Sequence, residues 1–216
     1  MITRSRNSIT AFNQRVEEYD NWFSRYPDIY QAEVKAIRDV LPFSTRAIEI
    51  GVGTGRFACP LGVSFGVDPA LRTLQRARDE GISVCCATGE ALPFPDGIFD
   101  LVLIVTVLCF ADDPERMLSE AKRVLQPGGM LVIGFIEKTS HLGQKYQTTK
   151  HDDPFFRYAR LFSTKEIISL LKDIGIRQLE FRQTLLPGTG TDAQDLTITP
   201  GYDRGGFVAV RGRVPG

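Results

Sequence analysis

The feature that most constrains the fold of this chain is a glycine-rich turn after a short apolar segment. Residues 47–50 read Ala-Ile-Glu-Ile, and the next glycines are Gly51, Gly53 and Gly55. A short apolar run bounded by turn residues is typical of a buried strand. Because glycine has no Cβ, such a turn lets a ligand approach the backbone closely. The segment therefore predicts a strand that leads into a ligand-binding turn.

A second apolar segment ends at a carboxylate that suits a ribose. Gly66 and Val67 precede Asp68, which lies 19 residues after Glu49. In nucleotide-binding α/β folds, an acidic side chain at about this separation stands at the end of the next strand and binds the ribose hydroxyls. The two segments together predict a nucleoside site at one edge of a parallel sheet.

The residues around the turn favour a cationic nucleoside over a dinucleotide. A dinucleotide fingerprint needs a small residue where this chain has Arg56. Glu49 would also repel a pyrophosphate in a partly dry cleft. S-adenosylmethionine carries a sulfonium and an ammonium beside its ribose, so a carboxylate at position 49 suits it. We therefore expect S-adenosylmethionine as the cofactor and S-adenosylhomocysteine as the product.

Four segments in order resemble the class I S-adenosylmethionine-dependent methyltransferases, in particular the family with the ubiquinone-biosynthesis type of methyltransferase domain. They are EIGVGTG at 49–55, GVD at 66–68, the stretch from GEALPF to FD at 89–100, and LQPGG at 125–129. Each is common alone, but the ordered set is specific. One departure is the gap from Gly55 to Asp68, which is shorter than usual by about one helical turn.

The resemblance implies a role for each matching residue. Glu49 would interact with the methionine ammonium, and Asp68 would accept hydrogen bonds from the ribose hydroxyls. Thr88 stands where the family usually presents an acidic residue to adenine. Tyr19 and Trp22 are candidates from an N-terminal lid. The predicted cofactor-binding residues are Tyr19, Trp22, Glu49, Gly51, Gly53, Gly55, Asp68, Pro69, Thr88, Gly89, Glu90 and Thr106.

Strand and helix patterns alternate along the chain, which favours an α/β fold with a parallel sheet. We expect strands at residues 47–50, 63–67, 82–87, 99–107, 130–135, 176–185 and 206–211. Asp113 with Pro114 predicts a helix start, and Ser163 with Glu166 predicts a capping box. The resemblance implies a Rossmann-like sheet of seven strands in the order 3-2-1-4-5-7-6. The last strand would be antiparallel, with helices on both faces.

Residues 9–41 show a helical spacing of apolar side chains, and Pro27 interrupts it, so two helices are expected. The resemblance implies that residues 1–41 form a lid over the cofactor. It also implies that residues 137–162, an aromatic segment, lie on the acceptor side. That segment holds both histidines, His141 and His151. A solvent-exposed position accounts for each of them as well, so no catalytic residue is assigned.

The composition limits the class of protein. A chain of 216 residues predicts one domain spanning residues 1–216. Lys and Arg total 26, as do Asp and Glu, and this balance disfavours nucleic acid as a partner. No apolar run reaches the ~18 residues of a membrane span and no signal-peptide pattern opens the chain, so a cytoplasmic protein without membrane insertion is expected. The spacing of the four cysteines predicts no metal site.

The predicted function is methyl transfer from S-adenosylmethionine to a small molecule, whose identity does not follow from the sequence. Two alternatives stay open. A non-catalytic module could hold the cofactor as a sensor or as a partner subunit, because this chemistry requires no particular catalytic side chain. A nicotinamide-dependent oxidoreductase could use the same fold, although Glu49 and Arg56 count against it.

Overall fold

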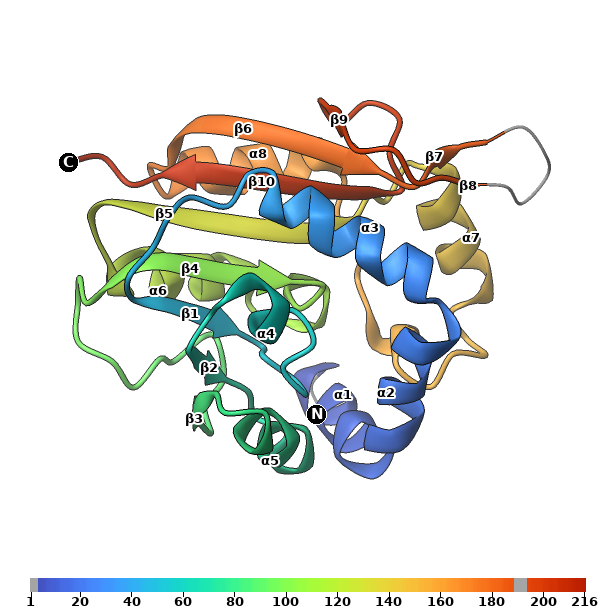
Figure 1. The fold of residues 1–216 in the computed structure, drawn as a ribbon, viewed down its shortest axis with the longest axis horizontal. Helices are drawn as coiled ribbons and strands as arrows, with labels where there is room; N and C mark the ends of the chain where they lie inside the picture. The colour runs from blue at the N-terminus through green and yellow to red at the C-terminus, as the bar shows by residue number, and fades with distance from the viewer. Residues whose placement is uncertain (1–3, 189–193) are drawn as a thin grey trace.

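A mostly parallel sheet forms the middle layer of the computed structural model, which describes residues 4–188 and 194–216. In that part of the chain, eight strands pair in the order β3-β2-β1-β4-β5-β10-β6-β9 (Figure 1). The strands are β1 Ala47–Ile50, β2 Phe65–Val67, β3 Ser83–Cys85, β4 Phe99–Val105, β5 Leu125–Ile136, β6 Arg177–Thr184, β9 Thr199–Pro200 and β10 Phe207–Arg213.

The strand order confirms the predicted seven-stranded arrangement and extends it. Without β9 the order reads 3-2-1-4-5-7-6, with β10 antiparallel to both of its neighbours, β5 and β6. The added strand β9 pairs with β6 at Arg182↔Pro200 and Gln183↔Thr199. A separate two-stranded ribbon joins β7, Leu186–Pro187, to β8, Gln194–Asp195.

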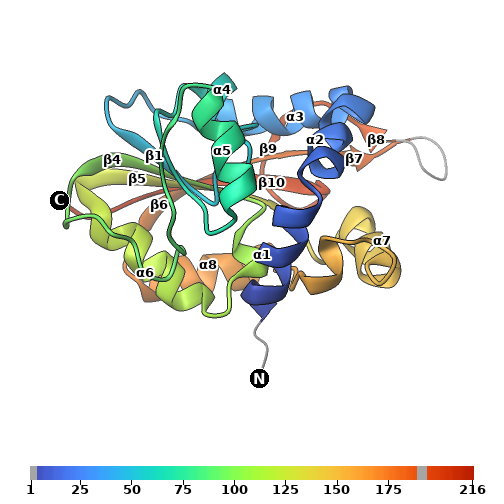
Figure 2. The same cartoon turned by 90° about the horizontal axis from the view of Figure 1, so that it is seen from below.

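Helices cover both faces of the sheet (Figure 2). They are α1 Arg4–Gln14, α2 Val16–Arg25, α3 Pro27–Arg38, α4 Ala58–Leu61, α5 Leu71–Asp79, α6 Pro114–Val124, α7 His141–Thr149 and α8 Thr164–Asp173, with the 3-10 turns η1 Leu108–Phe110 and η2 Phe156–Tyr158. The predicted starts are confirmed, because the Asp113 side chain caps α6 and Ser163 with Glu166 forms the capping box of α8.

Residues of β4 alternate between two hydrophobic cores. Val102 and Ile104 belong to the core that contains the apolar faces of α6 and α8. Leu101, Leu103 and Val105 belong to the core on the opposite face, with residues of α3, α4 and α5. A strand buried on both faces needs apolar residues at every position. This burial explains the uninterrupted apolar segment in the sequence.

The strand β4 ends two residues before the predicted boundary. Thr106 has a φ of +52°, in the left-handed region that residues other than glycine rarely adopt. Its N–H still donates to the carbonyl of Gly134 at 2.8 Å. The chain therefore leaves the sheet at Thr106, at the carboxyl edge of the parallel strands.

The strand β5 begins at Leu125 rather than at the predicted residue 130. Leu125 pairs with Phe99, and pairing resumes between Leu101 and Met130 after a shift in register. The Pro-Gly-Gly segment is thus an irregularity inside the ladder, not a turn before it.

The N-terminal region contains three helices where two were predicted. α3 begins at Pro27, which confirms the expected break, because the fixed φ of proline suits a first helical position. A second break at Arg15, with φ −129° and ψ 38°, separates α1 from α2. α1 and α2 lie beyond the carboxyl ends of β1 and β4 (Figure 1).

Candidate functional site

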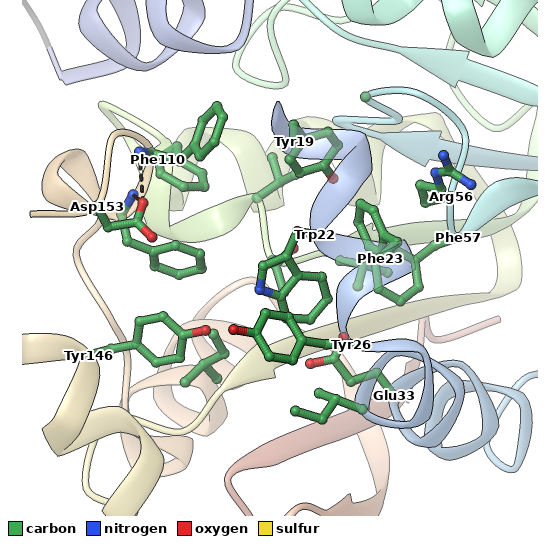
Figure 3. A pocket seen from close by; sticks show the side chains of 18 of the residues that line it. Tyr19, Trp22, Phe23, Tyr26, Glu33, Arg56, Phe57, Phe110, Tyr146 and Asp153 are labelled. Atoms are coloured by element: carbon green, nitrogen blue, oxygen red, sulfur yellow. Dashed lines mark hydrogen bonds between the residues drawn. The ribbon is translucent and has the colours of Figure 1, made fainter. Parts of the chain in front are cut away.

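A cavity of about 910 Å³ opens at the carboxyl edge of the parallel strands (Figure 3). Its wall combines residues that follow β1, β2 and β4 with residues of α1, α2, α3 and α7. Small-molecule sites have volumes of roughly 300–1,000 Å³. Open α/β sheets bind ligands at this edge, so the position and the volume both indicate a ligand site.

Eight of the twelve predicted cofactor-binding residues line this cavity. They are Tyr19, Trp22, Glu49, Gly51, Gly53, Asp68, Pro69 and Thr106. The tertiary structure thus brings together side chains from α2 and from three strand ends. The other four predicted residues, Gly55, Thr88, Gly89 and Glu90, are not part of its wall.

Two glycines of the turn are required by close packing. Gly51 has a φ of +74°, and a Cβ there would lie 2.3 Å from a side-chain carbon of Val107. Gly55 has a φ of +86°, and a Cβ there would lie 2.7 Å from Cδ1 of Ile82. Either substitution would force the turn away from its neighbours. Gly55 therefore determines the conformation of the turn without lining the cavity itself.

Asp68 is held at the end of β2 by two backbone donors. The N–H of Gly53 donates to Oδ2 at 3.0 Å, and the N–H of Ala70 donates to Oδ1 at 2.8 Å. Burial raises the pKa of Asp68 to about 6, and these hydrogen bonds oppose the rise. Each carboxylate oxygen can accept more than one hydrogen bond. Asp68 can therefore still accept hydrogen bonds from two hydroxyl groups of a ligand in the cavity.

Glu49 is a buried carboxyl group with one unsatisfied oxygen. The residue is 1% exposed, and its Oε2 has no hydrogen-bond partner among the described residues. Burial raises the pKa of Glu49 well above its ordinary value; a hydrogen bond from the Ala58 backbone opposes the rise and the Asp68 charge adds to it. An unpaired buried polar atom is costly. A cationic ligand group in the cavity would satisfy it, so the residues present fit the expected cofactor.

Asp20 of α2 forms two hydrogen bonds with the glycine turn. Its Oδ1 accepts hydrogen bonds from Thr54 Oγ1 and from Arg56 Nε, both at 2.8 Å. The adjacent Tyr19 lines the cavity, and a Cβ on Gly53 would lie 3.6 Å from its hydroxyl oxygen. Burial, together with the charge of Glu49, raises the pKa of Tyr19, which keeps its hydroxyl neutral.

The predicted cofactor-binding residues Thr88, Gly89 and Glu90 make other contacts. A Cβ on Gly89 would lie 2.7 Å from Cε of Met117, so this glycine is tightly packed. The Glu90 carboxylate accepts a hydrogen bond from the N–H of Asp112 at 3.1 Å. The carbonyl of Thr88 accepts one from the N–H of Ala91 at 3.2 Å. Their contact with the cofactor stays a prediction.

The cavity wall also contains residues that the sequence did not single out as site residues. The most notable are Tyr26, Glu33 and Arg204. Glu33 had a signal, since it is an acidic residue among Ala32, Ala36 and other apolar positions of a helical pattern. From residues 137–162, the wall includes His141, Tyr146, Phe155 and Phe156 but not His151.

The described residues contain neither a metal-binding cluster nor a membrane-spanning helix. Within residues 4–188 and 194–216, no group of three or more His, Cys, Asp or Glu side chains could hold a metal ion. No disulfide links the four cysteines, all of which lie in this part of the chain. Over the same part of the chain, no helix is both long and apolar enough to cross a membrane.

Comparison with known proteins identifies the class to which this site belongs. A family model described as a methyltransferase domain matches residues 48–133. An uncharacterised protein of Methanocaldococcus jannaschii is 41% identical over 202 residues, which cover 94% of this chain and 98% of that protein. The malonyl-[acyl-carrier protein] O-methyltransferase of Geobacter sulfurreducens is 26% identical over 196 residues, covering 83% of this chain and 73% of the enzyme.

A solved structure from Thermotoga maritima matches the whole fold. It is described as an S-adenosylmethionine-dependent methyltransferase and a possible histamine N-methyltransferase. It is 40% identical with a TM-score of 0.89, over 94% of this chain and 98% of that chain. The nicotinamide-dependent alternative does not agree with these relatives, and S-adenosylmethionine is the cofactor. The chain belongs to the class I S-adenosylmethionine-dependent methyltransferases.

Proposed function

We propose that this protein is an enzyme that transfers the methyl group of S-adenosylmethionine to a small-molecule acceptor. One observation carries the proposal. The carboxyl groups of Glu49 and Asp68, at neighbouring strand ends, line one cavity, and Glu49 Oε2 has no partner among the described residues. A ligand that combines an ammonium group with a ribose satisfies both carboxyl groups.

The residues of the turn would hold the cofactor in an extended orientation along the strand ends. Asp68 would accept the ribose hydroxyls, and Glu49 would face the methionine ammonium. Pro69 would lie against adenine. The edge of adenine would contact Thr88, Gly89 and Glu90. The backbone around Thr106 would contact the methionine end. The placement of Pro69 and Thr106 in the same wall as both carboxyl groups supports this orientation.

The helices α1 and α2 would cover the cofactor as a lid, and residues 137–162 would cover the acceptor. Aromatic contacts between the two segments support this arrangement. Phe12 of α1 stacks on Phe155 with ring centroids 4.8 Å apart, and it meets Tyr19 of α2 edge-on at 5.3 Å. Tyr19 and Phe155 both line the cavity. The rings therefore join the two covering segments beside the proposed site.

The bound cofactor supplies a methyl group that is already activated by its sulfonium. The protein then has to align the acceptor and exclude water, effects that together contribute about 7–11 kcal/mol at best. The apolar and aromatic wall of the cavity suits the exclusion of water. The proposal needs no side chain that reacts covalently.

The cavity supports a small acceptor but does not by itself define the acceptor atom. Its volume of about 910 Å³ suits a cofactor with a small molecule. Among the relatives, the name of the Thermotoga protein points to a nitrogen and the name of the Geobacter enzyme to an oxygen. The relatives therefore leave the acceptor atom open.

Calorimetric titration of the wild type and of Asp68→Ala with the cofactor tests the proposed site. The wild type should bind S-adenosylmethionine and S-adenosylhomocysteine with micromolar affinity and should not bind NAD. The variant should lose ~1.5–3 kcal/mol of binding free energy, because charge-assisted hydrogen bonds to the ribose are lost. Asp79→Ala, at an exposed position of α5, is the matched control and should bind normally. Unchanged affinity in Asp68→Ala would contradict the assigned role.

Turnover separates an enzyme from a cofactor-binding sensor or partner subunit. The protein is incubated with methyl-labelled S-adenosylmethionine and fractionated small metabolites. An enzyme should release S-adenosylhomocysteine in step with labelled product. Tight cofactor binding without label transfer to any fraction would favour the non-catalytic alternative.

A further inference from the structure

Glu33 is a buried carboxyl group that the proposed cofactor contacts leave unused. It lies on α3, is 6% exposed, and lines the cavity (Figure 3). Burial alone raises the pKa of Glu33 to about 8, with no hydrogen bond or ion pair from a described residue to oppose it. A buried carboxyl group without a partner destabilises a fold. Its position in the wall indicates that a ligand group is its partner.

Glu33 and the two cofactor carboxyl groups belong to different elements of the cavity wall. The charge of Asp68 acts on Glu49, as expected of neighbouring strand ends. The charges of Glu33 and Glu49 both act on Tyr19 and on Tyr30, so these acids surround the same cavity. Glu33 also comes from a helix, whereas Glu49 and Asp68 lie at strand ends. The proposed cofactor contacts use Glu49 and Asp68, so Glu33 is left to contact another ligand group.

The most deeply buried charged side chains of the cavity wall are acidic, whereas its exposed ones are of both signs, with Glu18 beside the basic groups. Glu33 and Glu49 are buried, and Asp68 is half-buried. The exposed basic or imidazole side chains of the wall are Arg25, His141, Lys145 and Arg204. Arg56 lies deeper, but it is paired with Asp20 at 2.8 Å. The inner cavity consequently favours cations over anions.

Aromatic side chains from α2 and α7 lie near Glu33. Trp22 and Tyr26 pack with ring centroids 5.5 Å apart, and Tyr146 faces them from α7 (Figure 3). The pKa of Tyr146 is raised by burial and, next, by the charge of Glu33, so the two side chains are within electrostatic reach. The faces of aromatic rings attract cations. A carboxyl group beside such rings is suited to an ammonium group.

We propose that the methyl acceptor is an amine with an apolar body, and that Glu33 binds its amino group between α2, α3 and α7. The amine binds as its ammonium form and passes one proton to the Glu33 carboxylate, which frees the nitrogen lone pair. The nitrogen then forms the new N–C bond as the S–CH3 bond of the donor breaks and S-adenosylhomocysteine leaves. The inference rests on the proposed function, because it concerns the acceptor of that reaction. A carboxylate acceptor would offer Glu33 no cationic partner, and the ionised form of Glu33 would repel it. A neutral alcohol would form neither an ion pair with Glu33 nor a cation–π contact with the aromatic rings.

The test compares amines with isosteres of the same shape. The protein, saturated with S-adenosylhomocysteine, is titrated with a panel of alkyl- and arylalkylamines, each beside its hydroxyl and carboxylate counterparts. One set is 2-phenylethylamine, 2-phenylethanol and 3-phenylpropanoate. Methyl transfer is then measured on the same panel with S-adenosylmethionine. At least one amine should bind at least tenfold more tightly than its isosteres and be methylated.

The variant Glu33→Gln removes the charge and keeps the shape of the side chain. Amine affinity should fall at least tenfold, while affinity for S-adenosylhomocysteine and for the neutral isosteres should not change. Glu115→Gln, at an exposed position of α6, is the matched control and should leave amine affinity unchanged. Because the substitution keeps the size of a side chain whose burial already favours the neutral form, loss of fold is not the expected cause of any defect.

Two outcomes would overturn the inference while the proposed function stands. The first is a wild type that binds the cofactor but binds no amine of the panel, or binds hydroxyl or carboxylate isosteres as tightly. The second is a Glu33→Gln variant with unchanged amine affinity. A wild type that binds neither S-adenosylmethionine nor S-adenosylhomocysteine would instead overturn the proposed function, and the inference with it.

Discussion

At the residue scale, three acidic side chains in one cavity have three different environments. Asp68 is supported by two backbone donors, Glu49 has one oxygen without a described partner, and Glu33 has no described hydrogen-bond partner. Burial raises the pKa of all three groups. Folding therefore retains groups that cost stability when the cavity holds no ligand. Such a cost is typical of a binding site.

The pH dependence of stability should change in Glu33→Gln. Burial raises the pKa of Glu33 from its ordinary 4.5 to about 8, so the native chain holds this proton more tightly than the unfolded chain. The free energy of unfolding therefore falls as the pH rises from 4.5 to 8, with a total loss on the order of 3–5 kcal/mol above that window.

Urea unfolding of the wild type and Glu33→Gln at pH 5 and pH 9 measures this loss. At pH 5 the group is protonated in the native state, so most of the penalty is absent from the wild type. The variant should be clearly more stable than the wild type at pH 9, with a much smaller difference at pH 5. An equal difference at both pH values would show that the carboxyl charge is not the cause.

At the element scale, α2 connects the glycine turn to the covering segments. Asp20 binds the turn through Thr54 and Arg56, while Tyr19 reaches Phe12 and Phe155 by edge-on ring contacts. The hydroxyl of Tyr30 on α3 also donates to the carbonyl of Arg56. The same short turn is therefore held by two helices, and its position depends on both.

Asp20→Ala should loosen α2 and weaken cofactor binding. The variant loses two hydrogen bonds to the turn, which contribute about 1 kcal/mol each before allowance for the partial exposure of the Arg56 side chain. Amide hydrogen exchange should accelerate across α2 more than across α6. Glu17→Ala, which removes exposed ion pairs to Arg72 and Arg76, is the control. Equal acceleration of α2 exchange in both variants would refute a specific role for Asp20.

At the scale of the whole molecule, the cavity is a property of the sheet and its covering helices together. Its wall consists of residues at strand ends, of the N-terminal helices, and of residues 185–187, Arg204 and Gly206 toward the C-terminus. A ligand that contacts all of these should stabilise the molecule as one unit.

Cofactor binding should raise the melting temperature. At a free concentration of one hundred times Kd, the gain is about 2.7 kcal/mol. For a domain of this size that corresponds to roughly 5–10 °C. Differential scanning calorimetry with S-adenosylmethionine checks the value, and the same concentration of NAD should leave the melting temperature unchanged. A rise with NAD alone would contradict the assigned cofactor.

The strand order could be anticipated because it follows from local patterns and a family resemblance. The apolar run of β4 is dictated by burial on both faces, and the break at Pro27 by the geometry of proline. The break at Arg15 and the early start of β5 could not be read from the sequence. Both depend on packing and pairing between distant segments, for which the local residues carry no signal.

By itself, the sequence determined the glycine turn, the two strand-end carboxyl groups and the class of cofactor. These follow from residues close together in the chain, where backbone conformation and spacing set the geometry. Only the tertiary structure decided that Glu33 of α3 and Tyr146 of α7 share the cavity. It also placed Thr88, Gly89 and Glu90 outside the wall of that cavity. The physical reason is that burial and side-chain contact depend on helix packing across the sheet, which residues remote in sequence control jointly.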